Sequence, residues 1–421
     1  MSKVHCVRTI RIAERPNLIW VEIETDEGLT GLGESFRGAQ AVEAVVHEQV
    51  APWLVGRDSR RIEAVSRHLM TPYLGFHSTG AEMRAASAID LALWDLAGKR
   101  HGVPVHEALG GAVRTEIRAY NTCAGYAYNS GGVARRAIHA ADAPAGPYDD
   151  QIAFMRDAGG LAESLLAEGF TAMKIWPLDI YADASGGQMI GLADLKAGIE
   201  PFRRVRAAVG DRIDIMCELH SLWSAGAALR ICQALEEFDV FWVEDPIAKM
   251  SDAKALADLR RRTRVPVCGS ETLGGAVSFR GMLEADAVDV VMLDLAWCGG
   301  LTEGRKIAAL AEAYAKPLAP HDCTGPVTLI AGLHLGLHAP TAIFQEVVRA
   351  TLATWYRDLV TDLPVIVNGM VQAPTGPGLG TALLPEVRGR GDAVIRETGQ
   401  ARRSGPGSSR GQAALVRFRQ E

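Results

Sequence analysis

The sequence predicts an α/β fold in which a barrel of alternating strands and helices follows a smaller N-terminal α+β domain. The first observation is a β-hairpin near the N-terminus, where the alternating run 18–25 and the returning run 29–34 flank the turn Asp26-Glu-Gly28. The second is a change of rhythm at about Glu116, after which strand-like runs alternate with helical patterns. The chain has 421 residues, which is enough for both parts.

The N-terminal part, residues 1–115, is predicted to be a separate domain. Helical patterns at about 39–52, 59–70 and 82–100 follow the hairpin. A small antiparallel sheet that is followed by helices is typical of an α+β domain.

Eight strand segments define the predicted barrel, which we place at residues 116–365. They are 117–122, 171–176, 213–218, 240–244, 265–271, 288–294, 316–321 and 343–347. Helical patterns lie between them, for example at 193–208, 224–237, 252–262, 276–284 and 302–315. This alternation indicates a parallel (β/α)-barrel. The long interval after the first strand contains the Gly- and Ala-rich stretch 127–150, which we interpret as an insertion loop at the mouth of the barrel.

The last part of the chain differs from the barrel in composition. The segment 366–398 is irregular and includes Pro377-Gly-Leu-Gly380. Residues 399–421 contain the run Arg-Arg-Ser-Gly-Pro-Gly-Ser-Ser-Arg-Gly, which is typical of a mobile tail.

The bulk composition is that of a globular protein with a sizeable core, since 48% of residues are hydrophobic and 22% are charged. The net charge of −6 is mild, so it gives no footprint for nucleic acid and no basic patch for a membrane surface. No apolar run has the length of a membrane span, and no signal core follows Met1. We therefore expect a cytoplasmic protein.

The seven cysteines form an odd set without paired short spacings, which favours reduced thiols. Cys217 and Cys268 stand close to candidate metal ligands. We interpret both as small core residues, because hard oxygen donors dominate that region.

Three glutamates recur at nearly equal intervals along the predicted barrel. Glu218, Glu244 and Glu271 are 26 and 27 residues apart, and each follows a short apolar or β-rich run. One strand plus one helix needs about this interval, so the three carboxylates are expected at the same ends of successive parallel strands. Converging carboxylates repel one another unless a hard cation such as Mg²⁺ joins them. The sequence therefore predicts a metal site at the mouth of the barrel.

The same register places other polar residues at strand ends. Lys174 and Trp176 end the second predicted strand, and Asp294, His321 and Glu346 end the sixth, seventh and eighth. Catalytic groups of such barrels lie at the C-terminal ends of the strands, so this series predicts an active site.

Several motifs together resemble the enolase superfamily, and specifically its mandelate racemase subgroup. One is Ala85-Ala-Ser-Ala-Ile-Asp90-Leu-Ala-Leu-Trp-Asp95-Leu-Ala-Gly-Lys99, with Pro104-Val and Ala108-Leu-Gly110 after it. The others are Val243-Glu-Asp-Pro246 and Pro377-Gly-Leu-Gly380. The resemblance covers nearly the whole chain.

This resemblance implies a capping domain over a (β/α)₇β barrel, with the segment 366–398 returning to the cap. It implies one Mg²⁺ per subunit, a small carboxylate as substrate and abstraction of the proton α to that carboxylate by a Lys or His base. A divalent ion stabilises the charge that develops on the carboxyl group. The family tendency also implies a homo-oligomer.

The resemblance assigns roles to the strand-end residues. His321 is the expected base, and Asp294 orients its ring and raises its proton affinity. Glu346 is expected to hydrogen-bond the substrate carboxylate in its protonated form, and Lys174 to neutralise that carboxylate. The family pattern has Asp where this chain has Glu218, a departure that leaves the ligand one methylene longer.

Two further positions favour elimination over racemisation. A two-base racemase of this subgroup has a Lys-x-Lys pair, but Trp176 stands in the second position and cannot exchange protons. Glu218-Leu-His220 resembles the Asp-x-His arrangement of acid-sugar dehydratases. Because residues i and i+2 of a strand share a face, His220 is expected to point into the cavity. Either His220 or His321 itself is then expected to assist loss of the β-hydroxyl.

Other candidate substrate contacts are Arg37, after the N-terminal hairpin, and His77, in a Gly-containing loop before the signature motif. Trp176 is a third. Trp297-Cys-Gly-Gly300 is interpreted as a tight turn between strand and helix, because it lacks the Lys of a phosphate-binding loop.

The preferred function is a Mg²⁺-dependent lyase that dehydrates a sugar acid to a 2-keto-3-deoxy acid through an enediolate. One alternative is a sugar-acid epimerase or lactone cycloisomerase of the same subgroup. A cycloisomerase of the muconate type is disfavoured, because its sixth strand carries Lys where this chain has Asp294. Another alternative is a non-catalytic barrel that binds a metal and an acid.

Overall fold

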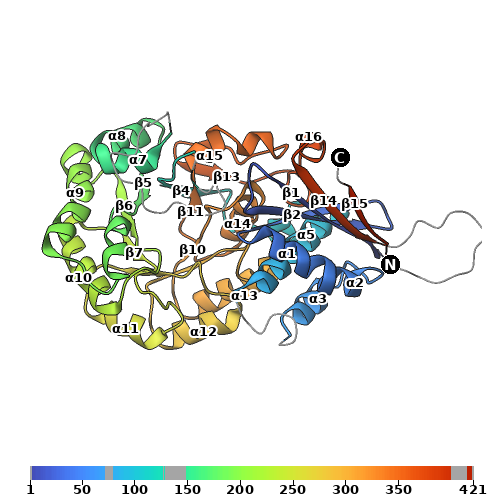
Figure 1. The fold of residues 1–421 in the computed structure, drawn as a ribbon, viewed down its shortest axis with the longest axis horizontal. Helices are drawn as coiled ribbons and strands as arrows, with labels where there is room; N and C mark the ends of the chain where they lie inside the picture. The colour runs from blue at the N-terminus through green and yellow to red at the C-terminus, as the bar shows by residue number, and fades with distance from the viewer. Residues whose placement is uncertain (1, 72–78, 127, 129–147, 400–414, 420–421) are drawn as a thin grey trace, which may run out of the picture.

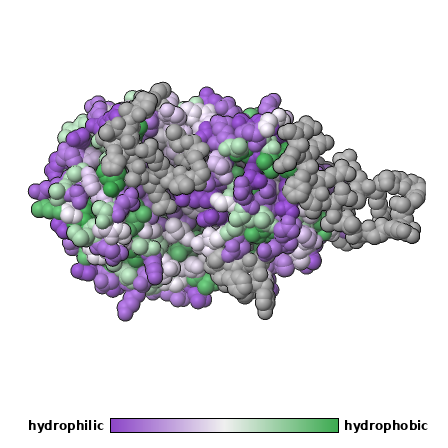
Figure 2. All heavy atoms as spheres, viewed as in Figure 1, coloured by the Kyte–Doolittle hydropathy of each residue, from purple (hydrophilic) through white to green (hydrophobic). Residues whose placement is uncertain are grey.

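The computed structural model describes residues 2–71, 79–126, 128 and 148–399, together with the backbone of 415–419. The chain forms two units that lie side by side, a ring of strands and helices and a smaller sheet with its own helices (Figure 1). On the face seen in Figure 2, the described hydrophobic residues are scattered among hydrophilic ones. Within the described ranges, no helix combines the length and apolar character needed to cross a lipid bilayer.

The smaller unit contains a five-stranded antiparallel sheet in the order β15-β14-β1-β2-β3. The strands are β1 (Val4–Ile12), β2 (Leu18–Thr25), β3 (Thr30–Phe36), β14 (Ala393–Gly399) and β15 (Leu415–Arg419). The predicted hairpin is confirmed as β2 and β3, which pair from Leu18–Phe36 to Glu24–Thr30. Strand β1 was not predicted.

The C-terminal part of the chain contributes two strands to this sheet. β14 pairs with β1 and β15 pairs with β14, both antiparallel. Strand β15 lies within the segment 399–421 for which the composition predicts a mobile tail, so that expectation does not hold for residues 415–419. The remainder of the segment, 400–414 and 420–421, lies outside the described residues.

Helices cover one face of this sheet. They are α1 (Ala39–Val45), the π-helix η1 (Val46–Val50), α2 (Ala51–Leu54), α3 (Ile62–Leu69), α5 (Ala81–His101) and α6 (Val105–Ala108). The long helix α5 packs directly on β3, and glycine permits this approach. A Cβ atom on Gly33 would lie only 1.9 Å from the carbonyl oxygen of Ala88.

The larger unit is a barrel of eight parallel strands, which confirms the predicted fold class. They are β4 (Glu116–Thr122), β5 (Ala172–Ile175), β6 (Asp214–Glu218), β7 (Trp242–Glu244), β8 (Val267–Gly269), β9 (Val290–Leu293), β10 (Leu318–Pro320) and β11 (Gln345–Val347). Neighbours from β4 to β10 pair in chain order, and β11 pairs with β4. The ring closes where the Ile343 amide donates to the Leu318 carbonyl oxygen at 2.9 Å.

The connecting helices lie outside the strands. They are α7 (Asp150–Arg156), α8 (Ala158–Ala167), α9 (Leu192–Val209), α10 (Ala225–Leu235), α11 (Ala253–Arg261), α12 (Ala276–Glu284), α13 (Gly300–Ala313) and α14 (Pro326–His338), followed by α15 (Arg349–Ala353). Helix α14 was not predicted. Its residues 326–337 are all buried, so the sequence lacks the polar face that reveals an amphipathic helix.

Short elements complete the chain: η2 (Asp179–Tyr181), η3 (Asp183–Ser185), η4 (Glu236–Phe238), η5 (Tyr356–Asp358), β12 (Ile366–Val367), β13 (Met370–Gln372) and α16 (Pro385–Arg388). β13 pairs antiparallel with the barrel strand β4, and β12 pairs with β13. Most of the predicted insertion 127–150 lies outside the described residues.

Side chains fill the barrel below the site. The inner cluster consists of Tyr120, Ala172, Met216, Trp242, Cys268, Val290, Met292, Ala319 and Phe344. Cys217 and Cys268 are both fully buried, and burial raises the pKa of each thiol well above its usual value. Their burial confirms the interpretation of both as small core residues, and all seven cysteines are free thiols.

The signature motif holds the two units together. The Asp90 carboxylate on α5 accepts hydrogen bonds from the amide and the hydroxyl of Thr302 on α13, at 2.8 and 2.6 Å. Asp95 accepts from the amides of Leu32 and Leu379, each at 2.8 Å, and forms an ion pair with Lys99 at 2.6 Å. One carboxylate therefore joins β3, α5 and the Pro377–Gly380 segment, which brings the C-terminal segment to the cap.

Candidate active site

The three predicted metal ligands meet at one end of the barrel. Glu218 and Glu244 are the last residues of β6 and β7 and lie opposite each other in the strand register, and Glu271 follows β8. One carboxylate oxygen from each of the three lies within 4.8 Å of the others. Strand register therefore produces the cluster that the spacing of 26 and 27 residues predicts.

The electrostatics of this cluster fit a cation. Burial and the neighbouring carboxylates raise the pKa of Glu244 well above its usual value, and burial raises that of Glu218 to about 7. The buried Glu218 Oε2 atom has no hydrogen-bond partner. Crowded, desolvated carboxylates with an unsatisfied oxygen provide the hard donors that Mg²⁺ prefers.

Lys174, at the end of β5, lies among these carboxylates. Its ammonium contacts Glu244 and lies 3.0 Å from Glu346 Oε1 and 3.6 Å from Glu218 Oε2. Burial favours the neutral amine, but the carboxylates outweigh it and raise the pKa of Lys174 well above its usual value. The lysine was expected to neutralise the substrate, and in the structure it neutralises the protein's own carboxylates.

His321 and Asp294 form the predicted pair. The Nδ1 atom of His321, directly after β10, lies 2.7 Å from Oδ2 of Asp294, directly after β9. Its Nε2 atom lies 2.9 Å from Glu271 and 3.9 Å from Glu346. Burial opposes a charge on the ring, yet Glu271, Glu346 and the bond to Asp294 together raise the pKa of His321 well above its usual value.

His220 forms a second pair of the same kind, with a residue that sequence reasoning missed. Its Nδ1 atom lies 2.7 Å from Oδ2 of Asp179, a buried residue in the loop after β5. The ring of Trp176 meets the His220 ring edge to face, with centroids 5.5 Å apart. Asp179 is not at a strand end, so the register gave no signal for it.

Glu346, the middle residue of β11, is held by several donors. Its Oε1 atom accepts from the Thr122 hydroxyl, and its Oε2 atom accepts from the Asp322 amide at 2.8 Å. Burial alone would raise its pKa, but Lys174 and His321 outweigh burial and lower it. This environment favours the carboxylate, whereas the sequence predicts a protonated Glu346 against the substrate, and that expectation stays a prediction.

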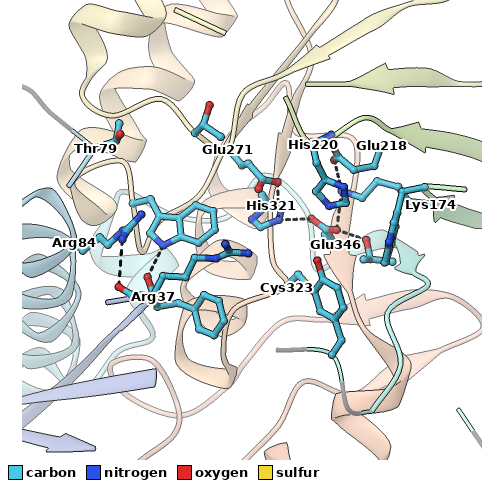
Figure 3. Close-up of a pocket in the computed structure, with 16 residues that line it drawn as sticks. Arg37, Thr79, Arg84, Lys174, Glu218, His220, Glu271, His321, Cys323 and Glu346 are labelled. Atoms are coloured by element: carbon cyan, nitrogen blue, oxygen red, sulfur yellow. Dashed lines mark hydrogen bonds and ion pairs between the residues drawn. The ribbon is translucent and has the colours of Figure 1, made fainter. Parts of the chain in front are cut away.

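One cavity is lined on one side by seven of these residues: Lys174, Trp176, Glu218, His220, Glu271, His321 and Glu346. Its other wall comes from the cap and from the turn after β9. That wall includes Phe36, Arg37, Thr79, Arg84 and Trp297. Figure 3 shows Arg37 and Arg84 on one side and Lys174, Glu218 and His220 on the other, with Glu271 and His321 between them.

Of the predicted substrate contacts, Arg37 and Trp176 line this cavity. His77 lies outside the described residues. Arg84 was not predicted, because it precedes the motif Ala85–Lys99 and does not lie at a strand end. Trp297-Cys-Gly-Gly300 is the predicted turn from β9 into α13, with Gly299 and Gly300 at φ of 107° and 77°.

Family models and related proteins of known sequence both place the chain in one family. Residues 5–110 match the N-terminal domain model of mandelate racemase / muconate lactonizing enzyme, and residues 157–387 match the enolase C-terminal domain-like model. The chain is 33% identical to a D-galactonate dehydratase of Ralstonia nicotianae, over 87% of this chain and 88% of that protein. It is 31% identical to a D-xylonate dehydratase of Haloferax volcanii, over 91% of this chain and 87% of that protein.

Solved structures agree with these sequence matches. An enolase protein from the environmental genome shotgun sequencing of the Sargasso Sea is 60% identical, with a TM-score of 0.86 over 96% of this chain and 100% of that one. An enolase of the mandelate racemase subgroup from Agrobacterium tumefaciens is 46% identical, with a TM-score of 0.84 over 94% of this chain and 99% of that one.

Proposed function

The chain belongs to the enolase superfamily, in its mandelate racemase/muconate lactonizing enzyme branch, and from this premise we propose that it is a Mg²⁺-dependent dehydratase of sugar acids. The observation that carries the proposal is the pair of His–Asp dyads, His321–Asp294 and His220–Asp179, whose histidines line one cavity with Glu218 and Glu271 of the three-carboxylate cluster. Relatives named as dehydratases of D-galactonate and D-xylonate support the same reaction type.

Glu218, Glu244 and Glu271 would hold the Mg²⁺ ion. Bound there, the ion supplies positive charge that stabilises the negative charge developing on the substrate carboxyl group, worth several kcal/mol. Lys174 adds a fixed positive charge to the same region and keeps Glu346 ionised.

His321 is the proposed base for the α-proton. An ionised Asp294 accepts the Nδ1 proton of the ring, which fixes the tautomer and leaves Nε2 to take a proton from the substrate. Since Nε2 lies on the side of Glu271 and Glu346, the proton-accepting atom is next to the metal cluster.

His220 is the proposed acid. Asp179 holds its Nδ1 atom, so Nε2 is the ring nitrogen left to give a proton to the departing β-hydroxyl. The C–O bond then breaks, water leaves, and the resulting enol tautomerises to a 2-keto-3-deoxy acid. Trp176 stands beside His220 where a second base would be needed for racemisation, so the site is arranged for loss of water.

The test is a library of sugar acids incubated with the protein and Mg²⁺ and assayed for 2-keto-3-deoxy product. We expect at least one acid to be dehydrated, and a chelator to lower the rate more than about 10³-fold, with recovery on adding Mg²⁺. Deuterium incorporation at Cα from D₂O without keto product would contradict dehydration and favour epimerisation. Product formation that a chelator does not affect would contradict the metal assignment.

A further inference from the structure

Two arginines stand together in the cap-side wall of the cavity. Arg37 follows β3, and Arg84 lies in the first turn of α5. The Arg84 Nη1 atom donates to the carbonyl oxygen of Arg37 at 3.3 Å, so the two residues are held as neighbours. In Figure 3 both lie on the side of the cavity away from Lys174 and Glu218, and the Arg37 side chain extends toward His321.

Their charges are not compensated by ion pairs. Within the described ranges, neither arginine has a carboxylate oxygen within the 4.0 Å of an ion pair, although 18 other arginines do. The Nε atoms of Arg37 and Arg84 are both buried without a hydrogen-bond partner. Burial, and then repulsion by Arg37, lower the pKa of Arg84. The two guanidinium groups in this wall therefore have Nε–H donors without an acceptor, and their positive charges repel each other. A bound anion would accept from these donors and reduce the repulsion.

The backbone at Arg37 is also unusual. Arg37 has a φ of 69° and is followed by Gly38 at 66°. The left-handed region is unfavourable for a residue with a side chain, and such conformations persist where the surrounding structure imposes them, often at ligand sites. Here the Arg37 amide donates to the Asn17 carbonyl oxygen at 2.8 Å, which fixes the turn.

We propose that Arg37 and Arg84 bind a second anionic group of the substrate, a terminal carboxylate or phosphate at the end away from the reacting carboxylate. This inference rests on the proposed dehydratase function. It makes the preferred substrate a dianionic sugar acid, such as an aldarate with a carboxylate at each end, in contrast to the monoanionic acids that the names of the relatives record.

Sugar hydroxyls alone fit this wall less well. A hydroxyl accepts hydrogen bonds but leaves both positive charges uncompensated in a partly buried place. A carboxylate or phosphate accepts the fork of a guanidinium bidentately, and such charge-assisted bonds are about twice as strong as neutral ones.

Binding to the His321→Asn protein with Mg²⁺ tests the proposal, because this variant should hold substrate without turning it over. Calorimetric titration would compare an aldonate, the aldarate of the same configuration and the aldonate phosphorylated at its terminal hydroxyl. We expect one of the two dianions to bind at least about tenfold more tightly than the aldonate. If the aldarate binds more tightly, the group that the arginines bind is a carboxylate, and if the phosphorylated aldonate binds more tightly, it is a phosphate.

Arginine variants in the same background assign the preference to this wall. Arg37→Gln and Arg84→Gln should each reduce the preference for the dianion over the aldonate to within about threefold. Arg37→Lys, which keeps the charge, should retain part of this preference. Arg261→Gln, at an exposed position of α11, is the matched control and should leave it unchanged. Thermal melting would verify that each variant is folded.

Two outcomes overturn the proposal: an aldonate that binds as tightly as both dianions, or arginine variants that weaken the aldonate and the dianions equally. The dehydratase assignment is tested separately by turnover of the wild-type protein. An intact dianion preference in binding, without keto product from any acid, would support the anion site and reject dehydration.

Discussion

The two His–Asp dyads at the cavity share one local geometry but differ in the elements that carry them and in the groups that surround them. Each joins a histidine Nδ1 to an aspartate Oδ2 at 2.7 Å. In the first, Asp294 and His321 directly follow neighbouring parallel strands, and His321 also meets the carboxylates of the metal cluster. In the second, a loop aspartate meets a histidine whose φ is 49°, next to Trp176.

This difference suggests a division of labour. The first dyad lies beside the proposed metal ligand Glu271, which suits a residue that takes the α-proton next to the substrate carboxyl group. In the second dyad, His220 packs against the Trp176 ring and follows the predicted metal ligand Glu218 by two residues. This position suits delivery of a proton to the hydroxyl group that leaves the substrate. In the proposed mechanism, α-proton exchange with solvent needs only the first dyad, whereas product formation needs both, so variants of the two dyads separate the two steps.

The largest effect is expected for His321→Asn. Removing the base should lower kcat for product formation by about 10³–10⁴-fold and abolish exchange of the α-proton into D₂O. Both are measured with Mg²⁺ present, product by keto-acid assay and exchange by proton NMR. Exchange that continues at the wild-type rate would show that another group removes the proton.

His220→Asn should separate the two steps. Product formation should fall by about 10²–10³-fold, whereas α-proton exchange should persist, since His321 and the metal cluster are intact. The same two assays apply, and the ratio of exchange to product should rise strongly. Loss of exchange and product in equal measure would place His220 in proton abstraction and remove the contrast between the dyads.

Asp294→Asn should weaken the base without removing it. An amide at this position no longer stabilises the charged ring and permits the wrong tautomer, so kcat should fall by about 10²–10³-fold with little change in KM. Exchange and product formation should fall together. A change confined to KM would instead indicate that Asp294 acts through substrate binding.

Asp179→Asn should have the smallest effect of the four, about tenfold on product formation, which is the usual scale for an outer residue that orients a ligand or catalytic ring. The exchange rate should stay within about twofold of the wild-type value, measured in the same NMR experiment. A fall in exchange as large as that of Asp294→Asn would show that the two dyads are not functionally distinct.

Much of the site was predictable because it follows a repeat. Parallel strands bring their C-terminal ends to one rim, so residues at intervals of about one strand plus one helix must meet there. That reasoning placed Glu218, Glu244, Glu271, Asp294 and His321. It also placed Lys174 and Glu346, but it did not foresee that they pair with each other, because the ionisation of a buried group depends on its neighbours in space.

Other features escaped the sequence for identifiable reasons. Strand β1 was not recognised, and helix α14 is buried on every side and so has no polar face to mark it. Strand β15 lies in a segment whose composition is typical of a tail.

The barrel, the cap and the ring of strand-end residues could be predicted from the amino-acid sequence, because hydrophobic periodicity and regular spacing repeat along the chain. Which residues away from the strand ends join that ring depends on the tertiary structure. Asp179 reaches His220 across 41 positions and Arg84 reaches Arg37 across 47, and neither interval follows the strand repeat. Contacts of this kind depend on how loops and helices pack against the barrel mouth, and no local pattern of residues specifies that packing.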